Sequence, residues 1–82
     1  MLSNQLKKYI MESVFELQPI DGRKSFNSKC RVIKVNNDYS LMSYNTIVAT
    51  YKNNVLEYEN VHLHSVTTKR HIKAFEQFIK TL

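Results

Sequence analysis

Hydrophobic residues in the middle of the chain fall in short, β-branched stretches that asparagine-rich turns separate. Such stretches are typical of strands, and they predict strands over residues 29–35, 39–44, 46–51 and 55–58. Asn36-Asn37-Asp38 and Lys52-Asn53-Asn54 supply turn residues between them. Connections this short join neighbouring antiparallel strands, so the pattern predicts an antiparallel meander.

The two ends of the chain show helical spacing instead. Residues 3–17, which Ser3 or Asn4 can cap, place six apolar residues on one face: Leu2, Leu6, Tyr9, Ile10, Val14 and Leu17. Residues 67–81 do the same with Ile72, Phe75, Phe78, Ile79 and Leu82. We therefore expect a helix at each end of the chain.

The expected order is α-β-β-β-β-α in a single domain over residues 1–82. Such an order predicts an α+β, two-layer fold, with a four-stranded antiparallel meander and both terminal helices packed on one face. Met11 and Phe15 fall on a separate face of the first helix, four residues apart. This pair is either covered by the 18–28 loop or serves as a partner contact.

Charge, cysteine content and hydropathy indicate which partners and which cellular location to expect. Twelve basic and seven acidic residues give a net charge of +5, which favours an acidic partner, either nucleic acid or a protein surface, or simply keeps a small protein soluble. Cys30 is the only cysteine, so no internal disulfide can form. No apolar run has membrane-spanning length and no secretory signal is visible, so we expect no membrane association and a cytoplasmic location.

A cluster of hydroxyl residues, Ser65 to His71, begins the last helix. A helix start gathers unpaired N–H groups and the positive end of the helix dipole. The cluster is therefore either a strong cap or a binding site for a small anion or a nucleotide phosphate at Thr67, Thr68 and His71. Residues 43–46 form a second hydroxyl cluster; if the two meet, the set is Ser43, Tyr44, Thr46, Ser65, Thr67, Thr68 and His71. That set is either a buried network that docks the last helix or an anion pocket.

Catalysis and metal binding find little support. His62 and His64 would point to one side of an extended segment, but this spacing is a weak zinc pattern without a nearby acid or cysteine. No carboxylate stands at motif spacing to a histidine, and a single glycine excludes a phosphate-binding glycine loop and a dinucleotide fingerprint. We expect no enzyme, no metal and no cofactor.

Two basic groups are compatible with nucleic-acid binding. Their candidate contacts are Arg31, Lys34, Lys69, Arg70 and Lys73. Tyrosines distributed through the strands could stack on the bases of a single strand.

Residues 41–71 resemble a family of small uncharacterised bacteriophage proteins. The resemblance lies in two motifs, SYxTxVA at residues 43–49 and SxTTxxH at residues 65–71. It implies a phage or prophage origin, an accessory role and the cytoplasm of a host cell. Our leading prediction is a non-catalytic, inhibitor-like protein that binds a host or defence-system protein; nucleic-acid binding and small-anion binding are the alternatives.

Overall fold

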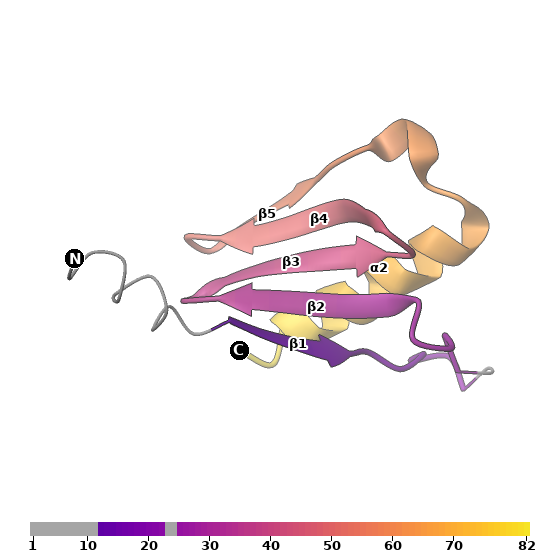
Figure 1. Cartoon of the computed structure of the whole chain (residues 1–82), viewed down its shortest axis with the longest axis horizontal. Coiled ribbons are helices and arrows are strands. Elements are labelled where there is room, and N and C mark those ends of the chain that lie inside the picture. The colour runs from indigo at the N-terminus through magenta and orange to yellow at the C-terminus, as the bar shows by residue number, and fades with distance from the viewer. Residues whose placement is uncertain (1–11, 23–24) are drawn as a thin grey trace, which may run out of the picture.

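The structure is a computed structural model, and it describes residues 12–22 and 25–82. Five strands form one antiparallel sheet in the order β1-β2-β3-β4-β5 (Figure 1). Their bounds are β1 Glu12–Glu16, β2 Cys30–Val35, β3 Asp38–Ser43, β4 Thr46–Lys52 and β5 Val55–Tyr58. A 3₁₀ turn, η1 (Val61–Leu63), leads into helix α2 (Val66–Ile79), which lies against the face of the sheet that is turned away in Figure 1.

The α+β class and the helix at the end of the chain are confirmed, but the sheet has five strands where four were predicted, and the predicted helix over residues 3–17 is wrong where it can be compared. Residues 12–16 form a fifth strand, and residues 3–11 of that prediction, Met11 among them, lie outside the described residues. β1 pairs with β2, with Phe15 opposite Val32 and Glu16 opposite Arg31. Phe15 and Leu17 pack against the core while Val14 is exposed. Pairing with β2 thus selects the period-2 pattern over the helical one.

The core lies between α2 and the sheet. Its buried residues are Phe26, Cys30, Val32, Leu41, Val48, Ala49, Ile72, Ala74 and Phe75. Burial of one large apolar side chain such as Phe75 stabilises the fold by about 1.5–3 kcal/mol. A single helix therefore supplies one of the two layers for all the described strands.

Asparagines make the hairpin turns, as the sequence predicts. Asn36, Asn53 and Asn54 adopt positive φ angles of 56°, 54° and 63°. Asparagine tolerates this left-handed region better than other residues with a side chain. The β3–β4 connection instead places Tyr44 there, at φ 58°, so its backbone is held by surrounding contacts.

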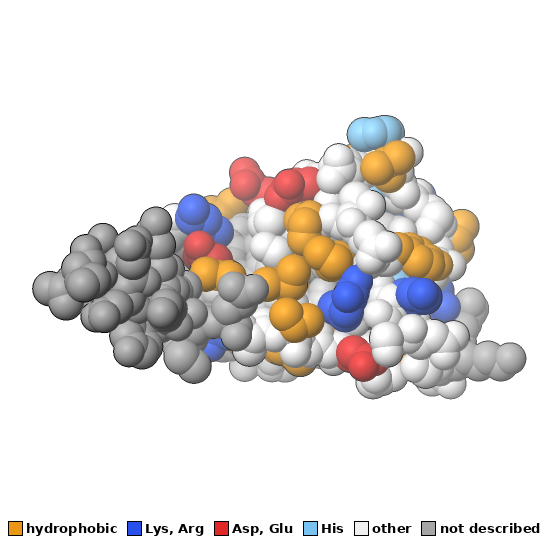
Figure 2. All heavy atoms as spheres, viewed as in Figure 1, with side chains coloured by type: hydrophobic (Ala, Val, Ile, Leu, Met, Phe, Trp, Pro, Cys, Tyr) orange, Lys and Arg blue, Asp and Glu red, His pale blue; other side chains and the backbone are white. Residues whose placement is uncertain are grey.

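The opposite face of the sheet carries no helix among the described residues. Apolar side chains gather over its middle in Figure 2, with basic and acidic side chains around them. Strand alternation assigns Val14, Ile33, Met42 and Ile47 to this face, because their neighbours Phe15, Val32 and Leu41 pack against the core. Within the described part of the chain, no helix has the length and apolar character needed to cross a membrane.

Candidate functional site

The start of α2 is capped by the protein's own side chains. Ser65 occupies the N-cap position, and its Oγ accepts a hydrogen bond from the backbone N–H of Thr68 at 3.1 Å. A serine in this position satisfies one of the free N–H groups at the helix start, which stabilises the helix by about 1 kcal/mol. The serine of the SxTTxxH motif is therefore a cap.

A chain of hydrogen bonds continues from this cap into the core. The Ser65 hydroxyl donates to Thr68 Oγ1 at 3.1 Å, Thr68 Oγ1 lies 3.0 Å from Ser43 Oγ, and Ser43 Oγ lies 2.7 Å from His71 Nδ1. Either hydroxyl can donate in the Thr68–Ser43 bond, and the role of His71 Nδ1 depends on which ring nitrogen carries the proton. Ser43 links Thr68 to His71 in either case.

The imidazole of His71 is enclosed by the core, with 0 % of the residue exposed. Phe26 meets it edge-on with ring centroids 4.4 Å apart, and the Tyr44 ring lies 5.7 Å away. Burial, with the neighbouring Arg70 charge, lowers the pKa of His71 from 6.5 to about 4, so the ring is neutral at neutral pH. Its Nε2 has no hydrogen-bond partner among the described residues.

The two hydroxyl motifs therefore meet through Ser43, Thr68 and His71, and the geometry favours the structural alternative for them. Ser43, Thr68 and His71 are buried and bonded to one another, so an anion at the helix start would have to displace these bonds. No side-chain hydrogen bond ties Thr46 or Thr67 to the network within the described residues. The network fixes how α2 docks on β3, because Ser43 belongs to the strand and the other two to the helix.

The five predicted nucleic-acid contacts do not share one surface. Arg31 lies on the sheet face opposite α2, where its guanidinium reaches the carbonyl of Tyr44 at 2.7 Å. Lys34 belongs to the other face, with its ammonium 5.7 Å from the centre of the Tyr39 ring. Only Lys69, Arg70 and Lys73 lie together, on α2.

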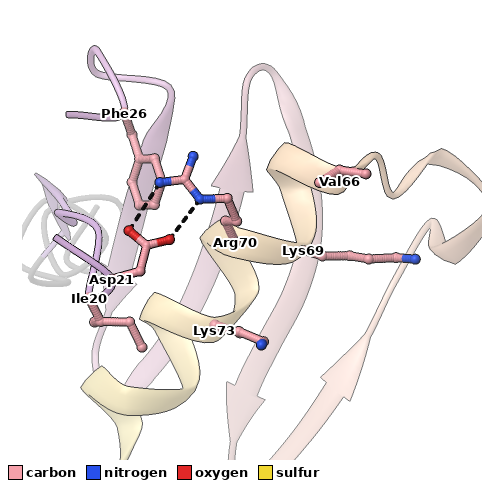
Figure 3. Close-up of a pocket in the computed structure, with 7 residues that line it drawn as sticks. All are labelled: Ile20, Asp21, Phe26, Val66, Lys69, Arg70 and Lys73. Atoms are coloured by element: carbon pink, nitrogen blue, oxygen red, sulfur yellow. Dashed lines mark hydrogen bonds and ion pairs between the residues drawn. The ribbon is translucent and has the colours of Figure 1, made fainter. Parts of the chain in front are cut away.

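These three α2 residues line a groove with a volume of about 590 Å³. The α2 groove, as we call it, is lined by Ile20, Asp21, Phe26, Val66, Lys69, Arg70 and Lys73. The side chains of Lys69 and Lys73 extend to one side of α2 in Figure 3, while Ile20, Asp21 and Phe26 lie on the other side. Sequence reasoning named the three basic residues but missed the apolar ones, because Ile20 and Phe26 come from a loop far away along the chain.

The groove has a fixed wall. The Arg70 guanidinium donates two hydrogen bonds to Asp21, at 3.0 and 3.2 Å, and lies 5.1 Å from the centre of the Phe26 ring (Figure 3). The Asp21 carboxylate neutralises this guanidinium and ties the loop to α2. Lys69 and Lys73 form no ion pair within the described residues, so the positive charge available to a partner comes from these two lysines.

An exposed apolar turn, η1, precedes α2. Val61 and Leu63 of η1 are 64 % and 55 % exposed, and η1 contributes no buried residue. The turn is nevertheless held on both sides: Asn60 Nδ2 donates to the Ile47 carbonyl at 2.8 Å, and His64 Nε2 lies 2.8 Å from the Glu59 carbonyl. Apolar side chains on an ordered, exposed turn are typical of contact surfaces.

The interpretation of Met11 and Phe15 as a partner contact gains no support, and neither does a zinc site at His62 and His64. Phe15 is half-buried and packs on Phe78, with ring centroids 5.3 Å apart, while Met11 lies outside the described residues. No group of three histidine, cysteine or acidic side chains that could hold a metal ion occurs in residues 12–22 and 25–82.

Comparison with known proteins gives one match. The model of a family of unknown function, DUF8033, matches residues 15–81, which include all of the α2 groove and the hydroxyl network. No curated protein and no solved structure matches the chain.

Proposed function

We propose that this chain, which belongs to the family of unknown function DUF8033, is a non-catalytic protein-binding domain that holds an acidic, partly apolar partner segment in the α2 groove. The observation that supports this most directly is the composition of the groove. Lys69 and Lys73, which form no ion pair with any residue that the structure describes, line the same groove as the exposed apolar side chains of Ile20 and Val66.

The apolar part of the groove supplies the affinity. Ile20 and Val66 are 57 % and 79 % exposed, so a partner would remove much apolar surface from water there. Each side chain that becomes fully buried contributes about 1.5–3 kcal/mol. Lys69 and Lys73 each add up to about 1 kcal/mol as exposed ion pairs, and they select carboxylates over other partners.

The apolar turn extends this surface. Leu63 lies three residues before Val66, so we expect a partner segment longer than the groove to contact Val61 and Leu63 as well. The combined surface has an apolar centre with charges at its rim, which is the arrangement of stable protein interfaces.

The partner class follows from the resemblance to phage proteins. A phage origin makes a host or defence-system protein the expected partner, bound in an inhibitor-like way in the host cytoplasm. The enclosed, neutral His71 supports a role without catalysis, since a general acid or base must reach its substrate.

A nucleic-acid partner fits the geometry less well. Arg31 and Lys34 face opposite sides of the sheet. Of the four tyrosines in residues 39–58, Tyr39 and Tyr51 are half-buried with ring centroids 6.4 Å apart, and only Tyr44 and Tyr58 are exposed. Stacking platforms for bases require exposed rings. We therefore favour a protein partner, and the experiment below distinguishes it from nucleic acid.

Peptide display tests the proposal without a known partner. The full chain would be used to select from a library of random peptides, and the Lys69→Glu/Lys73→Glu variant would be used in parallel. We expect enrichment of Asp or Glu next to aliphatic or aromatic residues, with binding lost in this variant. The control Lys29→Glu/Lys52→Glu carries the same net charge with both changes outside the groove, and it should retain binding.

Equal binding by both variants, or enrichment of basic peptides, would contradict the proposal. A third result would identify nucleic acid, rather than a peptide, as the ligand of the groove. This result is binding of single-stranded oligonucleotides that declines steeply with salt and is lost in the Lys69→Glu/Lys73→Glu variant.

A further inference from the structure

A second, smaller pocket lies at the end of the sheet, outside the α2 groove. The turn pocket, as we call it, has a volume of about 230 Å³ and is lined by Asn27, Ser28, Lys29, Arg31, Tyr44 and Asn45. Two of these residues are cationic, four carry neutral hydrogen-bonding side chains, and none is acidic. The lining thus carries a concentrated positive charge that no acid in the pocket offsets.

Arg31 is held in place at this pocket by one of its nitrogens. Its Nη2 donates to the Tyr44 carbonyl at 2.7 Å and lies 3.3 Å from Asn45 Oδ1 and 3.2 Å from the Met42 sulfur. The Nε atom of the same guanidinium is buried without a hydrogen-bond partner among the described residues. A ligand cannot reach the buried Nε, but Nη1 is neither buried nor hydrogen-bonded among the described residues, so the fixed guanidinium has a donor for a ligand there.

The walls of the pocket are ordered before any ligand arrives. The Tyr44 N–H donates to the Lys29 carbonyl at 2.8 Å, which joins the β3–β4 turn to the loop before β2. The loop itself is closed by the Lys29 N–H, which donates to the Phe26 carbonyl at 3.0 Å. Preformed walls reduce the entropy that binding would cost.

We propose that the turn pocket binds a phosphate group, either inorganic phosphate or the phosphate of a phosphomonoester. The fixed guanidinium of Arg31 and the exposed ammonium of Lys29 would supply charge-assisted hydrogen bonds to its oxygens. Asn45 directs its Oδ1 to Arg31, so its amide N–H₂ group is the part that can donate to the ligand. The volume holds a tetrahedral oxyanion with a few waters, at about 30 Å³ per water.

Amide NMR of the isotopically labelled full chain tests this inference. Sodium phosphate and adenosine monophosphate are titrated separately at neutral pH, with sodium chloride of equal ionic strength as the reference. We expect saturable shifts at residues 27–29 and 44–45. Stronger binding of the monophosphate would identify a phosphomonoester as the ligand, and equal or weaker binding would identify free phosphate.

Charge-removing variants separate this site from a general charge effect. Lys29→Gln, an exposed change that leaves the fold intact, should weaken phosphate binding by about fivefold, the upper range for one exposed ion pair. Arg31→Gln should weaken it by at least about tenfold. The control Lys52→Gln removes the same charge from outside the pocket and should change binding by less than about twofold.

Three results would overturn the inference. These are an absence of saturable shifts at residues 27–29 and 44–45, equal phosphate affinity of Lys29→Gln and the unmodified chain, or shifts confined to Lys69 and Lys73. The first two leave peptide binding in the α2 groove untouched, since Lys29 and Arg31 lie outside it, whereas the third would place phosphate on two lysines of that groove.

Discussion

Replacing Ser43 with alanine tests whether the hydroxyl network holds α2 on the sheet. The Ser43 hydroxyl is the only link that the described residues provide between Thr68 Oγ1 and His71 Nδ1. Without it, the imidazole loses its one hydrogen bond while remaining buried, because Nε2 is already without a partner among the described residues.

The expected cost can be worked out from these contacts. A buried polar group that loses its partner costs about 1–3 kcal/mol, and the variant affects both His71 and Thr68. We therefore expect a loss of about 2–4 kcal/mol in the free energy of unfolding. A chain of 82 residues has a total of about 4–12 kcal/mol, so this one hydroxyl carries a large share.

Urea unfolding followed by circular dichroism measures this loss. The control is Ser40→Ala, on the same strand but on the opposite face, which should change the free energy of unfolding by less than about 0.5 kcal/mol. A second variant, Ser43→Ala/His71→Phe, replaces both partners by apolar groups and should recover about 1–3 kcal/mol relative to the sum of the single changes. If Ser43→Ala were no more destabilising than Ser40→Ala, the network would not hold the helix.

Three further predictions concern buried and bridging groups. His71 has a folded pKa of about 4, below its ordinary 6.5, so the native state loses stability as the pH falls below 6.5. The free energy of unfolding, measured with urea, should be about 2 kcal/mol lower at pH 5 than at pH 8. Equal values at the two pH values would contradict the burial of the ring. Burial raises the pKa of the Cys30 thiol to about 12, so a thiol reagent should label it only at the rate of global unfolding, and fast labelling of the native chain would refute this. Tyr58 donates a hydrogen bond from β5 to Glu76 on α2, and Tyr58→Phe should lower the free energy of unfolding by about 1 kcal/mol or less, measured by urea unfolding against Tyr44→Phe.

The middle of the chain was predictable because its local signals agree with one another. β-branched stretches and asparagine turns alternate at lengths that suit only hairpins, and the last helix has both a serine cap and an apolar face. The short first strand was not predictable in this way. Val14 and Leu17 fit the apolar face of a helix, whereas Phe15 and Leu17 fit one face of a strand, and only pairing with β2 decides between the two patterns.

The surface was harder to predict than the core. Arg31 and Lys34 lie close together in the sequence and both are basic. Because successive residues of a strand point to alternate faces of the sheet, these two side chains, three residues apart, lie on opposite faces. Ile20 and Phe26 reach the α2 groove through a loop whose position depends on the Arg70–Asp21 pair. No local pattern encodes that contact.

The central claim is that the α2 groove binds an acidic, partly apolar segment. Amide NMR of the labelled chain, titrated with the best peptide from the display selection, tests it most directly. The account predicts shifts at residues 20–22 and 61–73, with little change in β2 and β3 on the face opposite α2. Shifts centred on that opposite face, over Ile33, Met42 and Ile47, would contradict the claim and assign binding to the uncovered sheet.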